Sequence, residues 1–199
     1  VPVNTVYFTG NLLDGDYTLT QFSASGVITR RARHSGVFYG SRFYIFGGTT
    51  ASYGASSISA TDVKNDFWYL DVTTGVWANL IPGSGGWPPA RYGHSMSIVT
   101  LPYIITRGAS REDLGAAAAA AAGYPTTDYL FIIGGYADQN TVLEDAWVFD
   151  ITNSFWYEVE LCAGPYEPRA YAAILSGIGR TDGFLYGGAT SANTETEDV

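Results

Sequence analysis

The chain has little cysteine, lysine, histidine or charge, and these shortages limit which covalent links, metal sites and partners it can have. Its 199 residues include one Cys, one Met, two His and a single Lys, Lys64. The lone Cys162 excludes a disulfide within the chain, and it leaves the redox compartment open. His34 and His94 have no further ligands at the usual zinc spacing, so the sequence predicts no metal site.

Net charge and hydropathy narrow the class of partner. Ten basic against nineteen acidic residues give a net charge of −9, which makes nucleic acid and anionic membrane surfaces poor partners. No apolar run approaches the roughly 18 residues of a membrane span, so no membrane insertion is expected. With 46% hydrophobic residues and 24 Gly, the chain can bury a core. The scarcity of Lys beside abundant Ser, Thr and Tyr points to an extracellular or lumenal protein, with intracellular assembly as the alternative.

A unit of strands recurs three times along the chain. Each copy begins with Arg and continues to an apolar strand closed by two glycines, and the first two copies then reach an aromatic strand that ends in Asp. Trp77 lies six positions after Asp71, and Trp156 lies six positions after Asp150. The copies begin at Arg31, Arg91 and Arg169, and their glycine pairs are 47–48, 134–135 and 187–188. Such recurrence predicts a repeat architecture.

This unit resembles the kelch repeat, which has a period of about 50 residues. The resemblance implies an all-β fold, a β-propeller of four-stranded blades, with about three to four blades represented in whole or in part. We expect a single propeller domain or fragment over 1–199. Its expected parts are a partial blade over 1–30, a blade over 31–82, a blade over 88–162 with an insertion at 101–128, and a partial blade over 166–199.

The repeated residues have structural explanations. Paired glycines after a buried strand permit positive φ and close backbone approach, and the absence of a following helix argues against a phosphate-binding loop. Asp71 and Asp150 precede turns, where a carboxylate accepts hydrogen bonds from backbone amides; a catalytic role is the alternative. Trp77 and Trp156 are expected to fill the space between adjacent blades. We therefore assign no catalytic, cofactor-binding or metal-binding residue.

Binding is expected in the loops that join the second and third strands of each unit. The kelch resemblance places these loops together on one face, and here they are long and polar. Loops on a rigid scaffold are where binding residues concentrate. The candidate binding residues in these loops are Tyr53, Lys64, Asp138, Gln139 and Asn140.

The function implied by the resemblance is a non-enzymatic protein-interaction or structural scaffold module. Its partner would be another protein or the subunits of a larger complex. One alternative is a lectin-like propeller that binds a glycan through exposed Tyr and Trp. A kelch-type copper oxidase is a further alternative, but the two His occupy repeat-equivalent positions and Cys162 lies in a turn-like stretch. No function is assigned to the seven alanines at 116–122.

Overall fold

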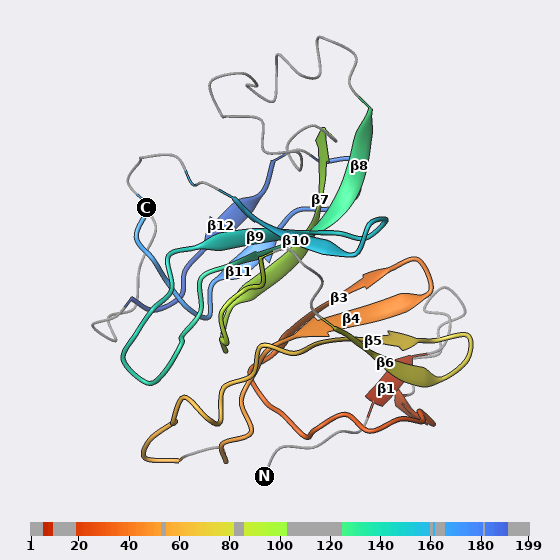
Figure 1. The fold of residues 1–199 in the computed structure, drawn as a ribbon, viewed down its shortest axis with the longest axis horizontal. Coiled ribbons are helices and arrows are strands. Elements are labelled where there is room, and N and C mark those ends of the chain that lie inside the picture. Colours follow the sequence, from red (N-terminus) through yellow and green to blue (C-terminus); the bar gives the residue numbers. More distant parts are fainter. Residues whose placement is uncertain are drawn as a thin grey trace.

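The part of the protein that the structure describes is built from strands alone. The computed structural model describes residues 6–9, 19–52, 55–81, 86–102, 125–159, 161, 166–180 and 182–190. Twelve strands and no helix occur in these ranges, so they contain no helix long and apolar enough to cross a membrane (Figure 1). The all-β prediction is confirmed.

The strands form two four-stranded antiparallel sheets, each flanked by a two-stranded hairpin on one side. The first sheet has the order β3-β4-β5-β6, with bounds Ser35–Tyr39, Arg42–Phe46, Phe67–Asp71 and Val76–Leu80. The second has the order β7-β8-β9-β10, with bounds Ser95–Pro102, Thr126–Ile133, Ala146–Asp150 and Phe155–Val159. The hairpins are β1–β2, Val6–Thr9 and Leu19–Phe22, and β11–β12, Ala173–Leu175 and Phe184–Tyr186. The described sheets form part of a kelch-type propeller and do not close into a ring.

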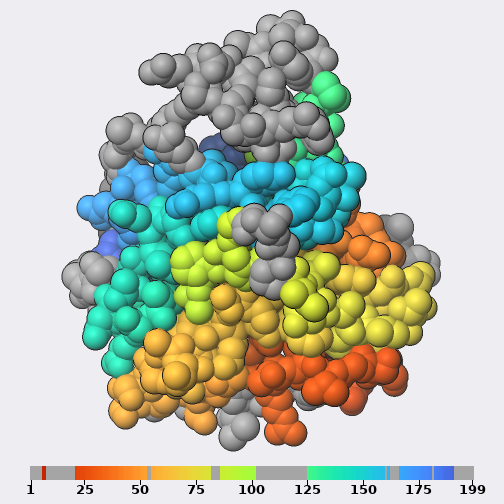
Figure 2. Space-filling model, viewed as in Figure 1, coloured from red at the N-terminus to blue at the C-terminus, as the bar shows by residue number. Residues whose placement is uncertain are grey.

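The two sheets share one register. Phe46 pairs with Ser35 and Phe67, and Ile133 occupies the same place in the second sheet. The first strands of successive units, β3, β7 and β11, are neighbours. The sequence repeat is therefore a structural repeat, and the first unit (orange to yellow) adjoins the second (green to cyan) in the space-filling view (Figure 2).

Aromatic side chains fill the space between the two sheets. The Trp156 ring lies 5.4 Å from the Phe46 ring and 5.1 Å from the Phe67 ring, measured between centroids. Phe149 packs edge-on against Phe67 at 4.7 Å. Trp156 is buried, which confirms that it fills the space between adjacent blades.

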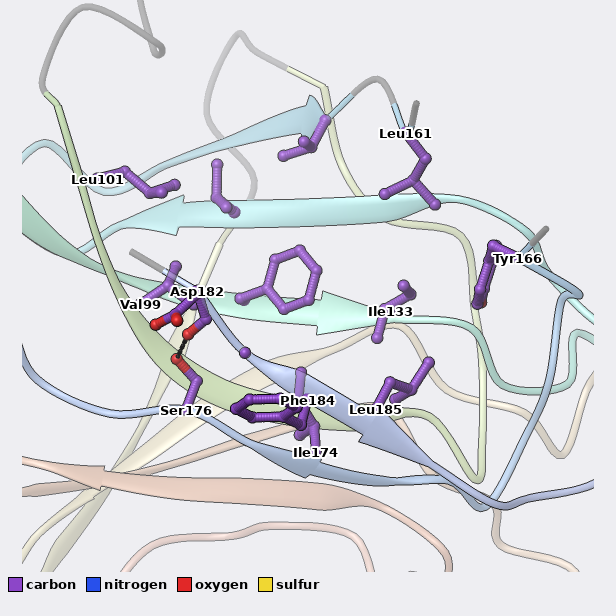
Figure 3. Close-up of a pocket in the computed structure, with 14 residues that line it drawn as sticks. Val99, Leu101, Ile133, Leu161, Tyr166, Ile174, Ser176, Asp182, Phe184 and Leu185 are labelled. Carbon is purple, nitrogen blue, oxygen red and sulfur yellow. Dashed lines mark hydrogen bonds between the residues drawn. The ribbon is translucent and has the colours of Figure 1, made fainter. Parts of the chain in front are cut away.

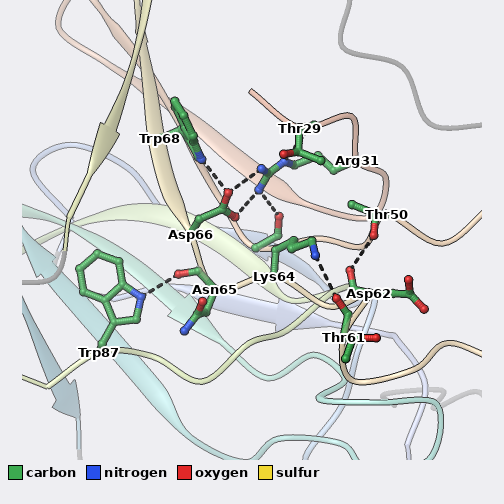
Figure 4. A network of polar contacts seen from close by, with 11 residues as sticks. Thr29, Arg31, Thr50, Thr61, Asp62, Lys64, Asn65, Asp66, Trp68 and Trp87 are labelled. Carbon is green, nitrogen blue, oxygen red and sulfur yellow. Dashed lines mark hydrogen bonds and ion pairs between the residues drawn. The ribbon is translucent and has the colours of Figure 1, made fainter. Parts of the chain in front are cut away.

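Each four-stranded sheet carries an equivalent ion pair near its third strand, Arg31 with Asp66 in the first and Arg91 with Asp145 in the second, and both arginines are buried. Arg31 binds both carboxylate oxygens of Asp66, at 2.5 and 2.7 Å, and donates to the Gly47 carbonyl (Figure 4). Trp68 Nε1 donates to the same carboxylate. Although burial acts to raise the pKa of Asp66, its hydrogen bonds with Arg31 and Trp68 hold that pKa below the usual value. Each pair ties the loop before the first strand to the start of the third.

The glycine pairs sit where a second sheet comes close. Gly47 has φ +60°, and a Cβ there would lie 2.4 Å from the Arg91 carbonyl oxygen of the next unit. Gly134 has φ +65°, and its Cβ would lie 2.3 Å from the Arg169 carbonyl oxygen. Both the conformation and the space therefore require glycine.

The insertion expected at 101–128 joins the first two strands of the second sheet. β7 extends to Pro102 and β8 starts at Thr126, so both strands continue into that range. Residues 103–124, with the alanines 116–122, lie outside the described part of the chain. The insertion stays a prediction.

Candidate functional site

Three loops, one from each repeat, meet through backbone hydrogen bonds. Arg33, Gly93 and Tyr171 occupy the same position of the repeat, two residues after its first Arg. The Gly93 amide donates to the Arg33 carbonyl at 2.8 Å, and the Tyr171 amide donates to the Gly93 carbonyl at 2.6 Å. This backbone ladder fixes the three positions relative to one another.

All three residues have left-handed backbone conformations, although only one is glycine. Their φ angles are +58° at Arg33, +65° at Gly93 and +60° at Tyr171. A side chain in this region costs of order 1–3 kcal/mol unless the surroundings compensate it. The first and third repeats therefore keep a costly side chain at a position where the second has glycine.

Three tyrosines gather beside this ladder. Tyr92 and Tyr136 stack with ring centroids 5.6 Å apart, and Tyr171 lies 6.0 Å from Tyr136. Tyr92 and Tyr136 are buried, whereas Tyr171 is 49% exposed. The Tyr92 hydroxyl donates to the Asp138 carbonyl at 3.2 Å. We call Arg33, Tyr92, Tyr136 and Tyr171 the tyrosine cluster.

Arg33 is the cation of this cluster. Its guanidinium carbon lies 5.6 Å from the centroid of the Tyr92 ring, in cation–π range. No carboxylate of the described residues forms an ion pair with Arg33. Burial raises the pKa of Tyr171, while the charge of Arg33 and its hydrogen bond to this phenol oppose the rise. Arg33 therefore offers a positive charge beside an aromatic surface.

The loop predicted to bind adjoins the tyrosine cluster. The Asp138 carboxylate accepts hydrogen bonds from the Asn140 and Thr141 amides, which lower its pKa. Gln139 Nε2 donates to the Ser56 carbonyl at 3.3 Å, so the second loop touches the first. Gln139 and Asn140 are exposed. Tyr53, the remaining candidate in the first loop, lies outside the described residues.

Lys64 lies at the seam between the first two units. Its ammonium group donates to the Thr61 carbonyl at 2.9 Å within its own loop (Figure 4). Its backbone carbonyl accepts the Arg91 amide at 3.0 Å. Lys64 thus contributes to the contact between repeats, and a binding role for it stays a prediction.

The tyrosine cluster was not identified from the sequence. Its residues come from three repeats, and only the packing of those repeats brings them together. One sequence signal was present: Gly93 marks a repeat position that suits positive φ, and Arg33 and Tyr171 stand at that position in the other two units. An unusual side chain at a glycine position could have indicated the site.

His94 directly follows Gly93 of the backbone ladder, and its side chain is buried. Its ring packs edge-on against Phe46, with centroids 5.7 Å apart. Neither ring nitrogen has a hydrogen-bond partner among the described residues. Burial, together with the charges of Arg91 and His34, lowers the pKa of His94 to about 3. The imidazole is therefore neutral at physiological pH and acts as a core side chain.

The lowered pKa of His94 predicts acid sensitivity. Above pH 6.5 the His94 ring is neutral in both the folded and the unfolded protein. Below pH 6.5 the unfolded protein binds a proton at His94, whereas the folded protein does not. The unfolding free energy should then fall by about 1.4 kcal/mol per pH unit between 6.5 and 3, or roughly 2 kcal/mol by pH 5. Urea unfolding of wild type and His94→Phe at pH 7.5 and 5 measures it. An unchanged pH slope in the variant would contradict the assignment.

The described residues hold no cluster of three or more His, Cys, Asp or Glu side chains that could bind a metal ion. The tyrosine cluster offers a guanidinium group, phenols and backbone groups. Such groups suit recognition of a partner's polar and aromatic surface.

Comparisons with known proteins agree with this architecture. Residues 11–188 match the family model described as the KLHDC2/KLHL20/DRC7 Kelch-repeats domain. The chain is 26% identical over 129 residues to Kelch domain-containing protein 1 of Mus musculus, an alignment covering 65% of this chain and 23% of that protein. It is 27% identical over 127 residues to Kelch domain-containing protein 2 of Bos taurus, covering 63% and 22%. The match thus spans about a quarter of these relatives' length.

Proposed function

The chain belongs to the kelch-repeat family, and on that premise we propose that it is a non-enzymatic protein-interaction module whose binding site is the tyrosine cluster with the adjoining loop at 136–145. Family members are generally modules of this kind. The observation that carries the proposal is the left-handed conformation of Arg33 and Tyr171. A fold selected for stability alone would place glycine there, as the second repeat does at Gly93.

The chemistry of the cluster favours a partner segment that carries a carboxylate. The Arg33 guanidinium can donate two parallel hydrogen bonds to one carboxylate, and no described acidic group forms an ion pair with it. The half-exposed Tyr171 provides an amphipathic surface next to it. Exposed Gln139 and Asn140 can contact the partner's backbone from the neighbouring loop. We expect an extended peptide with one acidic group at its centre.

Selection of peptides from a random library, followed by affinity measurement on wild type and Arg33→Gly, tests the proposal. We expect the enriched peptides to share a carboxylate. Loss of a charge-assisted hydrogen bond should weaken their binding by roughly tenfold to a hundredfold. Because glycine suits the Arg33 backbone, the variant should be as stable as wild type or more so.

Two controls separate binding from folding. Arg180→Ala removes an exposed guanidinium outside the cluster and should leave peptide affinity unchanged. Urea unfolding should show no loss of stability in Arg33→Gly. Peptides that bind the variant as tightly as wild type would contradict the proposed site, whereas a glycan-array signal that depends on Tyr171 would favour the lectin-like alternative.

A further inference from the structure

The first strands of the three units, β3, β7 and β11, all start at the backbone ladder. Each strand begins two residues after its ladder residue, which is Arg33, Gly93 or Tyr171. The three strands are neighbours but belong to three different sheets, so no sheet pairing sets the distance between them. Their spacing therefore depends on side-chain packing and on the contacts at their two ends.

A second set of contacts joins the same three units at the far ends of these strands. The hydroxyl of Tyr39, at the end of β3, donates to Asp128 Oδ2 at 3.1 Å, and the hydroxyl of Thr100 in β7 donates to Asp128 Oδ1. The Gly179 amide, in the turn after β11, donates to Thr100 Oγ1 at 2.6 Å. The Thr100 amide donates to the Arg180 carbonyl of the same turn at 2.7 Å. We call Tyr39, Thr100, Asp128 and Gly179 the Asp128 network.

A longer hairpin in the second unit makes this network possible. In the first unit, β3 ends at Tyr39, which pairs with Arg42 at the start of β4. The strands β7 and β8 continue one pair and more beyond the equivalent point, and the first added pair is Thr100 with Asp128. This extension reaches the end of β3 on one side and the turn after β11 on the other. The middle unit therefore contacts both of its neighbours here.

The groups that the extension contacts are themselves fixed. The Ser176 hydroxyl donates to the Asp182 carbonyl at 2.8 Å and closes the turn after β11 (Figure 3). Burial, together with the hydrogen bond to Asp128, raises the pKa of Tyr39, so this phenol stays protonated and can donate at neutral pH. Breaking either contact of the extension would therefore release one unit from its neighbour at this end.

We propose that the Asp128 network positions the tyrosine cluster. Asp128 sets the spacing of the first and second units and Thr100 that of the second and third, and this spacing holds Arg33 and Tyr171 where one peptide can contact both. Asp128 lies near the start of β8, whereas Tyr136 of the cluster follows its end, so the network acts through the strands and not by contact. The inference rests on the proposed function, because it concerns the same binding site.

Amide hydrogen exchange, followed by NMR, tests the coupling without any peptide. The hydrogen bond of the Gly93 amide joins the first and second units, and that of the Tyr171 amide joins the second and third. Tyr39→Phe should speed exchange of the Gly93 amide by roughly tenfold and leave the Tyr171 amide near its wild-type rate, because only the first contact is lost. Thr100→Val removes the acceptor of the Gly179 amide and should speed the Tyr171 amide instead.

Two variants separate positioning from a general loss of stability. Asp71→Ala removes a carboxylate that accepts the Thr73 and Thr74 amides within one turn of the first sheet, so it should leave exchange of both ladder amides unchanged. Asp128→Asn keeps an acceptor for the Thr100 hydroxyl and gains an amide that can donate to the Tyr39 oxygen. It should exchange at close to the wild-type rate, whereas Asp128→Ala should behave as Tyr39→Phe does.

Peptide affinity gives the second readout. The probe is the tightest peptide selected on the wild-type chain, measured against Tyr39→Phe, Asp71→Ala and Arg33→Gly. We expect Tyr39→Phe to weaken binding by roughly threefold to tenfold and Asp71→Ala to leave it unchanged. In the Arg33→Gly background Tyr39→Phe should have no further effect, because the guanidinium that it helps to position is gone.

Two results would overturn the inference. One is a wild-type exchange rate of the Gly93 amide in Tyr39→Phe. The other is equal acceleration of both ladder amides in Tyr39→Phe, Thr100→Val and Asp71→Ala, as a general loss of stability would produce. The proposed function fails separately, since it is contradicted when Arg33→Gly binds the peptide as tightly as wild type, whatever the exchange rates are.

Discussion

Replacing Arg91 by Ala should lower the unfolding free energy by about 3–5 kcal/mol, because it leaves a largely buried carboxylate without its cation. The Arg91 side chain is 0% exposed, and its Nη2 lies 2.6 Å from Asp145 Oδ2. Its other donors reach the Gly134 and Pro89 carbonyls. Urea unfolding followed by tryptophan fluorescence measures the loss.

Two variants calibrate the Arg91 result. Arg91→Lys keeps the charge but cannot reach Asp145 and both carbonyls at once, so its loss should lie between wild type and Arg91→Ala. Arg180→Ala breaks an ion pair whose side chains are 58% and 60% exposed, and it should change stability by less than about 1 kcal/mol. A loss at Arg91→Ala no larger than the loss at Arg180→Ala would show that the buried pair does not hold the second repeat together.

The sequence predicted the parts of the fold that depend on short-range patterns. The strands, the glycine pairs and the turns all have local signals. Asp71 and Asp150 accept backbone amides from the turns that follow them, as predicted. The repeat also predicted that Trp156 lies between the sheets. A large aromatic residue that recurs at the same position of successive units is expected to form the contact that those units share. These features follow from local chemistry and repetition.

The sequence did not predict contacts that depend on the relative orientation of the repeats. Arg31 and Arg91 were recognised as repeat positions, but their carboxylate partners Asp66 and Asp145 lie 35 and 54 residues away. The tyrosine cluster combines residues from all three units. The hydrogen bond from the Lys64 ammonium group to the Thr61 carbonyl could not be predicted from the sequence either, and a binding role for Lys64 stays a prediction.

Replacing Trp156 by Ala should lower the unfolding free energy by about 3–5 kcal/mol, the usual cost of removing a large aromatic side chain from a core. Trp156 is 2% exposed, and its ring touches Phe46 and Phe67 of the first sheet and Phe149 of its own. Because these rings belong to both sheets, the resulting cavity would weaken the contact between repeats directly. Calorimetry and urea unfolding measure the change.

Trp156→Phe separates the ring contacts from the indole nitrogen. Trp156 Nε1 has no hydrogen-bond acceptor among the described residues, so losing it should cost nothing, and phenylalanine keeps part of the aromatic contact. The expected order of stability is wild type, then Trp156→Phe, then Trp156→Ala. Combining Trp156→Ala with Phe67→Ala should cost less than the two single losses together, because each variant already removes the contact that they share. Strictly additive losses would mean that the sheets are joined elsewhere, and the repeat-to-repeat packing assigned to this position would be wrong.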